Sequence, residues 1–434
     1  MKEKIMSEQS NNQREYDGII CVGGEDWWYH NRGHFDFQIM RRMAKDRPVL
    51  FINSLGVRMP SLSDKSLFMK RITRKLKSLK RGIVNVENNF WVFSPLNIPG
   101  KTGRTISEQT LAPQIKLAAR YAGIKKPLLW MHCPAGAHLV KSLAPVATVM
   151  QRTDRFEAFT EITDDSVSKA VAELKSDADL VVYCNEELRR EEEADVKSSC
   201  LITHGVDYER FSNAAISSNE ISSSEHSANA HLQVNRPKEM QHINGPLIGF
   251  IGGIDHHSFD PDLFLQTAQR LPNCQFILVG NCSLEQDWCT LPNVHLLGQK
   301  PYDQVADYMA ACDTLIMPWN KSDWINACNP IKLKEYLATG RPVVSRDIPA
   351  LAPYRDLVRT AEDADTFASA IADSLLYPGD PKQAQMAVKD ETWEAKVEQL
   401  NTHLLEIGIK FASAHIATPQ IAEHGKLDDL SRAT

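Results

Sequence analysis

The sequence predicts an α/β protein built from two doubly wound domains that face each other across a cleft. Short, continuously apolar runs alternate with helical stretches along most of the chain, which is typical of parallel sheets covered by helices on both faces. The alternation occurs in two sets separated by residues 213–245, and 434 residues suffice for two domains with separate cores. Ligands of such sheets bind at the carboxyl ends of the strands, so we expect the functional residues there.

The first set extends over residues 15–212, after a polar tail at 1–14. A helix is expected at 37–44. Because both faces of a parallel sheet are buried, its strands read as unbroken apolar runs. These runs predict strands within residues 17–24, 48–53, 90–93, 128–132, 146–150 and 179–184.

The second set extends over residues 246–394. Helices are expected at 261–271, 302–312 and 330–339. The predicted strands are 247–251, 275–279, 294–297, 314–317 and 343–344. Apolar residues at helical spacing continue after Trp393 and predict a last helix at 395–412, followed by a polar tail at 413–434.

Residues 213–245 interrupt this order. They are rich in Ser, Asn, Ala and His and contain no Phe, Tyr or Trp, so they can bury little apolar surface. We interpret them as a flexible linker or insertion between the domains.

Composition excludes several classes of protein. A net charge of −6 argues against general nucleic-acid binding, which favours a basic domain. Nine cysteines without a C-x-x-C pair indicate reduced thiols in a cytoplasmic protein. The N-terminus has no signal-peptide core, and no apolar run reaches the 18 to 20 residues or so that span a bilayer. We therefore expect a cytoplasmic protein, with a peripheral position on the inner face of the membrane left open.

The segment 326–345 is the most informative piece of the chain. Asn329 is expected to cap a helix whose first residue is Pro330, where a missing N–H costs nothing. Gly340 fits the left-handed residue that ends the helix, and Pro342 prevents it from resuming. The polar start of this helix is a suitable site for a phosphate group.

This segment resembles the donor-binding signature of family-4-like (group 1) glycosyltransferases, which have the GT-B fold. Further fragments resemble the same family in the same order: Asp179–Leu188, His204–Phe211, Gly249–Asp255 and Leu291–Gly298. The nearest subgroup is that of bacterial surface-polysaccharide enzymes, including teichuronic-acid-type transferases. The resemblance implies two Rossmann-like domains and a C-terminal helix that crosses back to the first domain.

The resemblance also implies an activity. The expected reaction moves a sugar from a nucleotide-diphosphate sugar to a saccharide acceptor that is lipid-linked in the surface-polysaccharide subgroup, with retention of configuration. The nucleotide sugar is then a co-substrate, and no cofactor is expected. The protein's partners would be this donor, the acceptor and an anionic membrane surface, with no nucleic acid.

Donor binding is expected in the second domain. Gly252 and Gly253 follow a strand directly and would let the backbone approach a phosphate closely, with Asp255 nearby. At the signature helix, which we expect to begin in an exposed turn, Lys332 is the cation best placed for a diphosphate and Glu335 resembles the family's ribose-binding acid. The remaining expected donor contacts are Asn329, Pro330 and Ile331.

One position departs from the family pattern. Many relatives carry a second Glu eight residues before the ribose-binding acid, where it holds the donor sugar, and this chain has Ala327 there. Either Asp323, Asn326 or the backbone of residues 327–330 would have to replace it. Donor specificity therefore cannot be transferred from the family.

Two residues of the first domain are expected to be catalytic. His132 closes a predicted strand, and the resemblance implies contact with the donor sugar. Asp154 has a similar position after the strand 146–150 and would orient the acceptor or the donor; its alternative role is a helix cap.

Acceptor binding is expected in the loop after the first strand. Aromatic faces stack on sugar rings, and an arginine pairs with an anionic acceptor. The expected residues are Gly24, Trp27, Trp28, His30 and Arg32, the alternative for the aromatic residues being a packed cluster.

Residues 70–81 carry seven cations and no acid, with Phe68, Ile72, Leu76 and Leu79 near one helical face. In a chain that is acidic overall, this pattern favours a membrane-surface patch over an ordinary solvated helix. The expected membrane residues are Lys70, Arg71, Arg74, Lys75, Lys77, Lys80 and Arg81.

No metal ligands are predicted. The pair Asp260 and Asp262 has the letters of a metal motif, but Pro261 between them is more typical of a helix start. Two other functions remain as alternatives to the transferase: a GT-B sugar-nucleotide epimerase and a catalytically silent subunit that binds nucleotide sugars. A nicotinamide dehydrogenase is disfavoured because no G-x-G-x-x-G follows the first strand.

Overall fold

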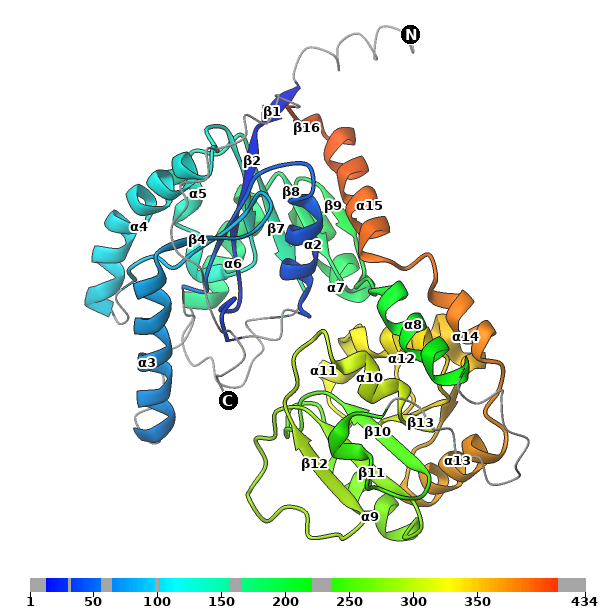
Figure 1. Cartoon of the computed structure of the whole chain (residues 1–434). Coiled ribbons are helices and arrows are strands. Elements are labelled where there is room, and N and C mark those ends of the chain that lie inside the picture. The colour runs from blue at the N-terminus through cyan, green and yellow to red at the C-terminus, as the bar shows by residue number, and fades with distance from the viewer. Residues whose placement is uncertain are drawn as a thin grey trace, which may run out of the picture.

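The computed structural model describes residues 13–29, 33–55, 65–97, 101–153, 155, 166–220 and 236–412, with the backbone alone for 65–72, 101–108, 166, 215–220 and 327. Two sheets form the cores of two domains, and the view in Figure 1 separates them clearly. The predicted class, two doubly wound α/β domains, is confirmed.

The first sheet has the order β4-β5-β3-β2-β6-β7-β8-β9, with only the β4–β5 pair antiparallel. The chain builds outward from β2 through β3 and β5, then returns to place β6 on the other side of β2. This reversal is the switch point of the sheet. The strands are β2 (Gly18–Val22), β3 (Val49–Ile52), β4 (Ile83–Glu87), β5 (Phe90–Phe93), β6 (Pro127–Met131), β7 (Ala147–Arg152), β8 (Leu180–Tyr183) and β9 (Ser199–Leu201).

Both faces of the first sheet are buried, which explains its unbroken apolar strands. Ile19 and Cys21 of β2 join one core cluster, and Ile20 and Val22 join the other. The covering helices are α2 (Phe35–Met43), α3 (Lys65–Arg81), α4 (Lys101–Tyr121), α5 (Leu139–Leu143), α6 (Ser166–Asp177) and α7 (Glu186–Glu192), with short 3-10 turns at Pro134–Gly136 and Glu193–Asp195.

The second sheet is wholly parallel, with the order β12-β11-β10-β13-β14-β15 and a switch point between β10 and β13. Its strands are β10 (Leu247–Ile251), β11 (Gln275–Val279), β12 (Val294–Gly298), β13 (Thr314–Met317), β14 (Val343–Ser345) and β15 (Val358–Thr360). Its helices are α8 (Tyr208–Glu220), α9 (Pro261–Arg270), α10 (Val305–Ala310), α11 (Asp323–Ala327), α12 (Ile331–Thr339), α13 (Ala364–Leu376) and α14 (Pro381–Val388), with 3-10 segments at Lys238–Met240 and Pro349–Leu357.

The last helix returns to the first domain, as the fold class predicts. Helix α15 (Trp393–Glu406) packs against α2, and its Trp393, Leu400 and Leu404 are buried in the first domain's core. Strand β16 (Ile409–Phe411) then pairs in parallel with β1 (Arg14–Tyr16). In Figure 1 this final segment runs from α14 beside the second domain to β1 at the far end of the first.

The segment expected to be a linker is partly structured. Residues 213–220 continue helix α8, which packs on α12 and α10, and Phe211 and Ala214 contact the second domain's core. After residues 221–235, which lie outside the described residues, Met240 and Ile243 are buried in the same core. The average composition of these 33 residues did not indicate that a few apolar residues near either end pack into the core.

The chain crosses between the domains twice, and the two crossings lie side by side. Val206 in the first crossing forms a parallel bridge with Thr392 in the second. A Cβ added to Gly205 would lie 2.8 Å from the Cα of Trp393. Figure 1 shows the two crossings, at α7–α8 and α14–α15, on the same side of the molecule.

Beside the switch point of the second sheet, the backbones that follow β10 and β11 are in close contact. A Cβ on Gly280, directly after β11, would lie 1.7 Å from the carbonyl oxygen of Gly252, directly after β10. Because this obstacle is backbone, Gly280→Ala should lower the free energy of unfolding by about 3 kcal/mol or more. Gly379→Ala is the control: its φ is +81° but no atom lies within 4 Å, so a loss of about 1 kcal/mol is expected. Urea denaturation measures the free energy of unfolding, and equal losses in the two variants would contradict this account.

Candidate functional site

A cavity of about 550 Å³ lies where the carboxyl ends of both sheets meet. It is therefore located at both switch points, as expected for open α/β sheets. The first domain contributes His34, His132, Gln151, Thr153 and His204, and the second contributes Gly252, Gly253, Asp255, Tyr302, Trp319 and residues 328–332 with Glu335.

All eight predicted donor residues line this cavity. The side chain of Lys332 lies over Gly252, since a Cβ added there would be 2.0 Å from the lysine Cε and 2.8 Å from Nζ. The Lys332 ammonium is 5.7 Å from the ring centroid of Trp319. Burial lowers the pKa of Lys332, while the charges of Glu335 and Asp255 act in the opposite direction.

Glu335 is buried, with 6% of its surface exposed, whereas the sequence indicated an exposed first turn. Helix α12 is covered by α8, α10 and α14, so even its polar side is inside the protein. The Tyr302 hydroxyl donates to Glu335 Oε1 at 3.2 Å. Burial raises the pKa of Glu335 to about 7, although Lys332 and the Tyr302 hydrogen bond favour its charged form.

The start of α12 differs from the prediction by one residue. Pro330 is the cap and the helix begins at Ile331, with no side-chain cap bond, so Asn329 is one position too early to be the N-cap. The extended conformation of Pro330 (ψ 121°) accounts for this shift. The end is as expected, with Gly340 in the left-handed conformation at φ 68°.

His132 forms the first-domain wall of the cavity. Its Nδ1 is 3.0 Å from Oδ2 of Asp36, and its Nε2 is 3.4 Å from Oγ1 of Thr153. Asp36 is fully buried at the start of α2 and also accepts from the backbone N–H of Gly24. Burial would raise the pKa of Asp36, but the histidine and this N–H hold it at about 2. Asp36 therefore fixes the orientation of His132.

His204 lies where the first crossing borders the cavity. Its ring packs edge-on against Phe35, with centroids 5.7 Å apart, and against Trp393 at 6.2 Å. Burial, together with the cation of Lys334, lowers its pKa to about 3, so the ring is neutral at physiological pH. Within the described ranges, its buried Nδ1 has no hydrogen-bond partner.

The predicted acceptor loop is largely a packing element. Trp27 is only 2% exposed and contacts Phe37, Phe51 and Phe90, so the prediction of an acceptor contact is wrong for this residue. It fills the sheet face because the loop folds back over β3 and β5.

Trp28 stacks under the Arg81 guanidinium, 4.3 Å from its ring centroid, and does not line the cavity. Gly24 lies against His132, since an added Cβ would be 2.7 Å from the imidazole. Three further predicted site residues, His30, Arg32 and Asp154, lie outside the described residues.

The basic helix is α3, and part of its charge is used within the domain. Lys75 Nζ donates to the carbonyl of Ser54 at 3.1 Å, and Arg74 lies 5.2 Å from the Tyr29 ring centroid. Arg74 and Arg81 are nevertheless exposed and Lys75 is half-buried, so a membrane role stays a prediction for all three. Lys77 and Lys80 are exposed. The side chains of Lys70 and Arg71 lie outside the description.

Asp260 has a structural role, and Asp262 is exposed in the first turn of α9. Asp260 caps α9 through the N–H of Leu263 and pairs with Arg346 at 2.8 Å. Across the described ranges, no three His, Cys, Asp or Glu side chains gather in a way that could hold a metal ion. Asp323 and Asn326, the alternatives for the missing Glu at Ala327, are exposed on α11 and do not line the cavity.

Sequence reasoning missed Asp36, Thr153, His204 and Tyr302. Asp36 gave a local signal, an acid between two phenylalanines directly before the helix expected at 37–44. Tyr302 follows Pro301 in a loop that was read only as a helix start. Their partners are 96 and 33 residues away, so no local pattern could pair them.

Two doubly wound domains whose switch points meet at one cavity define the GT-B class of proteins. Residues 245–376 match the family described as Glycosyl transferases group 1. The chain is also 30% identical over 173 residues to TuaH of Bacillus subtilis (strain 168), whose assigned name is teichuronic acid biosynthesis glycosyltransferase. That match spans 39% of this chain and 39% of the relative.

Solved structures agree in fold over nearly the whole chain. Sucrose-phosphate synthase from Thermosynechococcus elongatus has a TM-score of 0.62 at 14% identity, covering 90% of this chain and 99% of that one. The Anabaena protein HepE in complex with UDP-glucose has a TM-score of 0.61 at 15% identity, covering 90% and 100%. At these identities the likeness establishes the GT-B fold alone.

The buried neutral His204 makes stability depend on pH. Its pKa is about 3 in the folded protein against 6.5 for a free side chain, so the unfolded chain binds the extra proton as pH falls below 6.5. Stability from this residue is therefore present above pH 6.5 and lost toward pH 3. His204→Phe keeps the ring packing and the backbone carbonyl. Urea denaturation should show the wild type losing about 2 kcal/mol relative to this variant between pH 7 and pH 5. A difference that stays constant over this range would contradict the assignment.

Proposed function

We propose that the protein is a glycosyltransferase that moves a sugar from a nucleotide-diphosphate sugar to a saccharide acceptor. The observation that carries the proposal is the cavity between the two switch points, with Lys332 and the glycine backbone at 252–253 on one domain and His132 on the other. The group 1 family match and the UDP-glucose complex of HepE support a nucleotide sugar as donor.

The second domain would hold the nucleotide. The Lys332 ammonium, together with the glycine backbone at 252–253, would neutralise the diphosphate as it leaves. The Glu335 carboxylate would accept hydrogen bonds from the ribose hydroxyls, with the Tyr302 hydroxyl steadying it. Because these groups would neutralise the diphosphate without a cation, we propose a metal-independent reaction.

The first domain would hold the transferred sugar. His132, oriented by Asp36, faces the cavity from the end of β6 and would contact the donor sugar. We keep Asp154 as a candidate for orienting the acceptor or the donor, and retention of configuration as the family-based expectation.

The acceptor is proposed to be lipid-linked, in the assembly of a cell-surface polysaccharide, with the enzyme in the cytoplasm at the inner face of the membrane. The similarity to TuaH and the exposed cations Lys77 and Lys80 on α3 support this proposal. No helix in the described part of the chain is long and apolar enough to cross a membrane.

Glu335→Gln should weaken UDP binding by about tenfold or more, because an amide accepts fewer hydrogen bonds from a diol than a carboxylate does. In the wild type, UDP affinity should rise as pH increases through about 7, where Glu335 ionises. Isothermal titration calorimetry measures both effects. Glu362→Gln, on the same domain but not lining the cavity, serves as control. Unchanged affinity of Glu335→Gln for UDP would refute the donor site.

Transfer itself requires a product assay. Purified protein incubated with nucleotide sugars and a lipid-linked saccharide should extend the acceptor, and should do so equally in EDTA. An altered nucleotide sugar formed without acceptor would favour the epimerase, and binding without any product would favour the silent subunit. Either result would overturn transfer.

The double substitution Lys77→Glu and Lys80→Glu should release the protein from anionic vesicles without lowering its Tm, since both side chains are exposed. Each cation contributes about 1 kcal/mol near such a surface. Co-sedimentation measures the effect, and raised salt should mimic it because screening shortens the attraction to about 8 Å at physiological salt. Lys125→Glu with Lys126→Glu changes the net charge equally on another segment. Equal release by both double variants would leave α3 without a specific role.

A further inference from the structure

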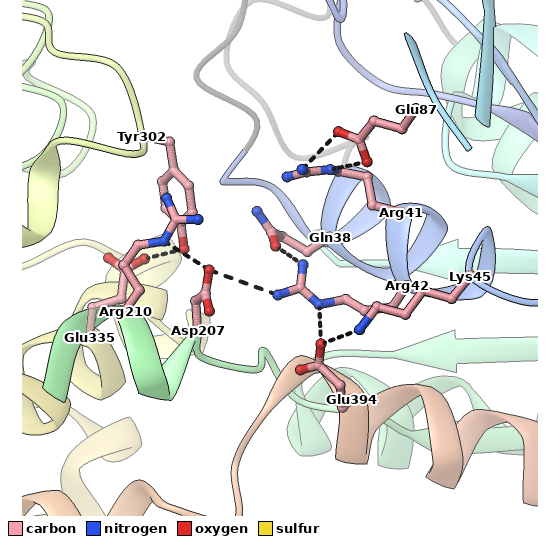
Figure 2. Close-up of polar contacts among 10 residues, drawn as sticks. All are labelled: Gln38, Arg41, Arg42, Lys45, Glu87, Asp207, Arg210, Tyr302, Glu335 and Glu394. Atoms are coloured by element: carbon pink, nitrogen blue, oxygen red, sulfur yellow. Dashed lines mark hydrogen bonds and ion pairs between the residues drawn. The ribbon is translucent and has the colours of Figure 1, made fainter. Parts of the chain in front are cut away.

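The surroundings of Glu335 extend beyond the cavity to the junction of the domains. Figure 2 draws the side chains concerned. Behind the carboxylate, the Tyr302 hydroxyl donates to Oε1 at 3.2 Å. The ring of Tyr302 is in turn covered by the guanidinium of Arg210, 5.2 Å from its centroid. Arg210 belongs to α8, which follows the first crossing directly.

Arg210 is held by the crossing itself. Its Nε is 3.0 Å from Oδ2 of Asp207, the residue just before α8. The same carboxylate oxygen is 4.0 Å from NH2 of Arg42, which lies on α2 of the first domain. A continuous series of contacts therefore leads from Glu335 in the second domain to Arg42 in the first.

Arg42 also contacts the second crossing. Its Nε donates at 3.2 Å to Oε1 of Glu394, which lies at the start of α15. Its NH1 donates to Oε1 of Gln38. The side chain of Arg42 is only 11% exposed, so it is fixed between both crossings. A rotation of the first domain that shifts α2 against the first crossing would move this guanidinium relative to Asp207.

We propose that Tyr302, Arg210 and Asp207 are positioning residues for Glu335, and that Arg42 connects them to the first domain. The inference deepens the proposed function, on which it rests, by adding the residues that set the donor-site carboxylate. Closure of the cleft would strengthen or weaken the 4.0 Å contact of Arg42 with Asp207, and so change how Arg210 holds Tyr302. Nucleotide binding and domain position would then be coupled.

The charges in this series act on Glu335 with opposite signs, which makes the proposal testable. The groups that act on its pKa, after burial, are Lys332 on its own helix, Tyr302, and Asp207 with Arg210 at α8. Lys332, Tyr302 and Arg210 lower the pKa, and Asp207 raises it. Asp207→Asn should therefore lower the pKa of Glu335, whereas Arg210→Gln and Tyr302→Phe should raise it. A loss of packing alone would not shift the pKa of Glu335 in opposite directions in these variants.

The direct measurement is the carboxyl ¹³C titration of glutamate-labelled protein without ligand, with the Glu335 signal assigned by its loss in Glu335→Gln. Shifts of a few tenths of a pH unit in the stated directions are expected. Arg42→Gln leaves the charge of Asp207 less neutralised, so it should raise the pKa of Glu335 by less than Arg210→Gln does. Arg41→Gln is the matched control, since Arg41 lies on the same helix but pairs with Glu87 at 2.7 Å. Its midpoint should equal that of the wild type.

Shifts of the same sign in Asp207→Asn and Arg210→Gln would overturn the proposal, and so would an unchanged midpoint in Arg42→Gln. Melting curves identify any variant that fails to fold, and Arg210→Lys, which keeps the charge, should restore the wild-type midpoint. UDP calorimetry on the wild type separates the two hypotheses. Absent UDP binding refutes the donor site, whereas the titration, which needs no ligand, still decides whether these residues set Glu335.

Discussion

The close contact of the two interdomain crossings is the constraint on which the site depends. Lys334, although on the second domain's α12, extends into this contact and donates to the His204 carbonyl at 2.6 Å and to Glu391 at 2.5 Å. Lys396 of the first-domain helix α15 meets the same Glu391 at 2.8 Å. Burial would raise the pKa of Glu391, but the two ammonium groups lower it. One half-buried carboxylate, shared by two buried lysines, therefore joins the domains.

This junction places two switch points opposite each other, and the cavity follows from that placement. Neither domain holds a complete site. The second domain contributes cationic and glycine-lined surface near Lys332, and the first contributes the imidazole of His132. A donor that contacts both walls would stabilise one relative position of the domains, which is the general basis of cleft closure on a ligand.

Burial determines the electrostatic character of the cavity. Glu335 has its pKa raised to about 7 and His204 has its pKa lowered to about 3, in both cases because burial disfavours charge. Asp36 is the opposite case, since its contacts with His132 and Gly24 outweigh burial. A neutral His204 and a half-ionised Glu335 leave Lys332 as the group placed to attract a diphosphate.

The sequence by itself predicted most of the strands in their order, because parallel strands buried on both faces need unbroken apolar runs, and it predicted the helix end at Gly340. It also indicated residues 329–332 and Glu335, which line the cavity, because these residues lie in one short segment. It did not predict the short strands β4, β9 and β15. Only the tertiary structure decided that Trp27 is a core residue, that Glu335 is buried, and that Asp36 orients His132. Such properties arise from contacts between residues far apart in the chain, and local patterns carry no information about which of them will meet.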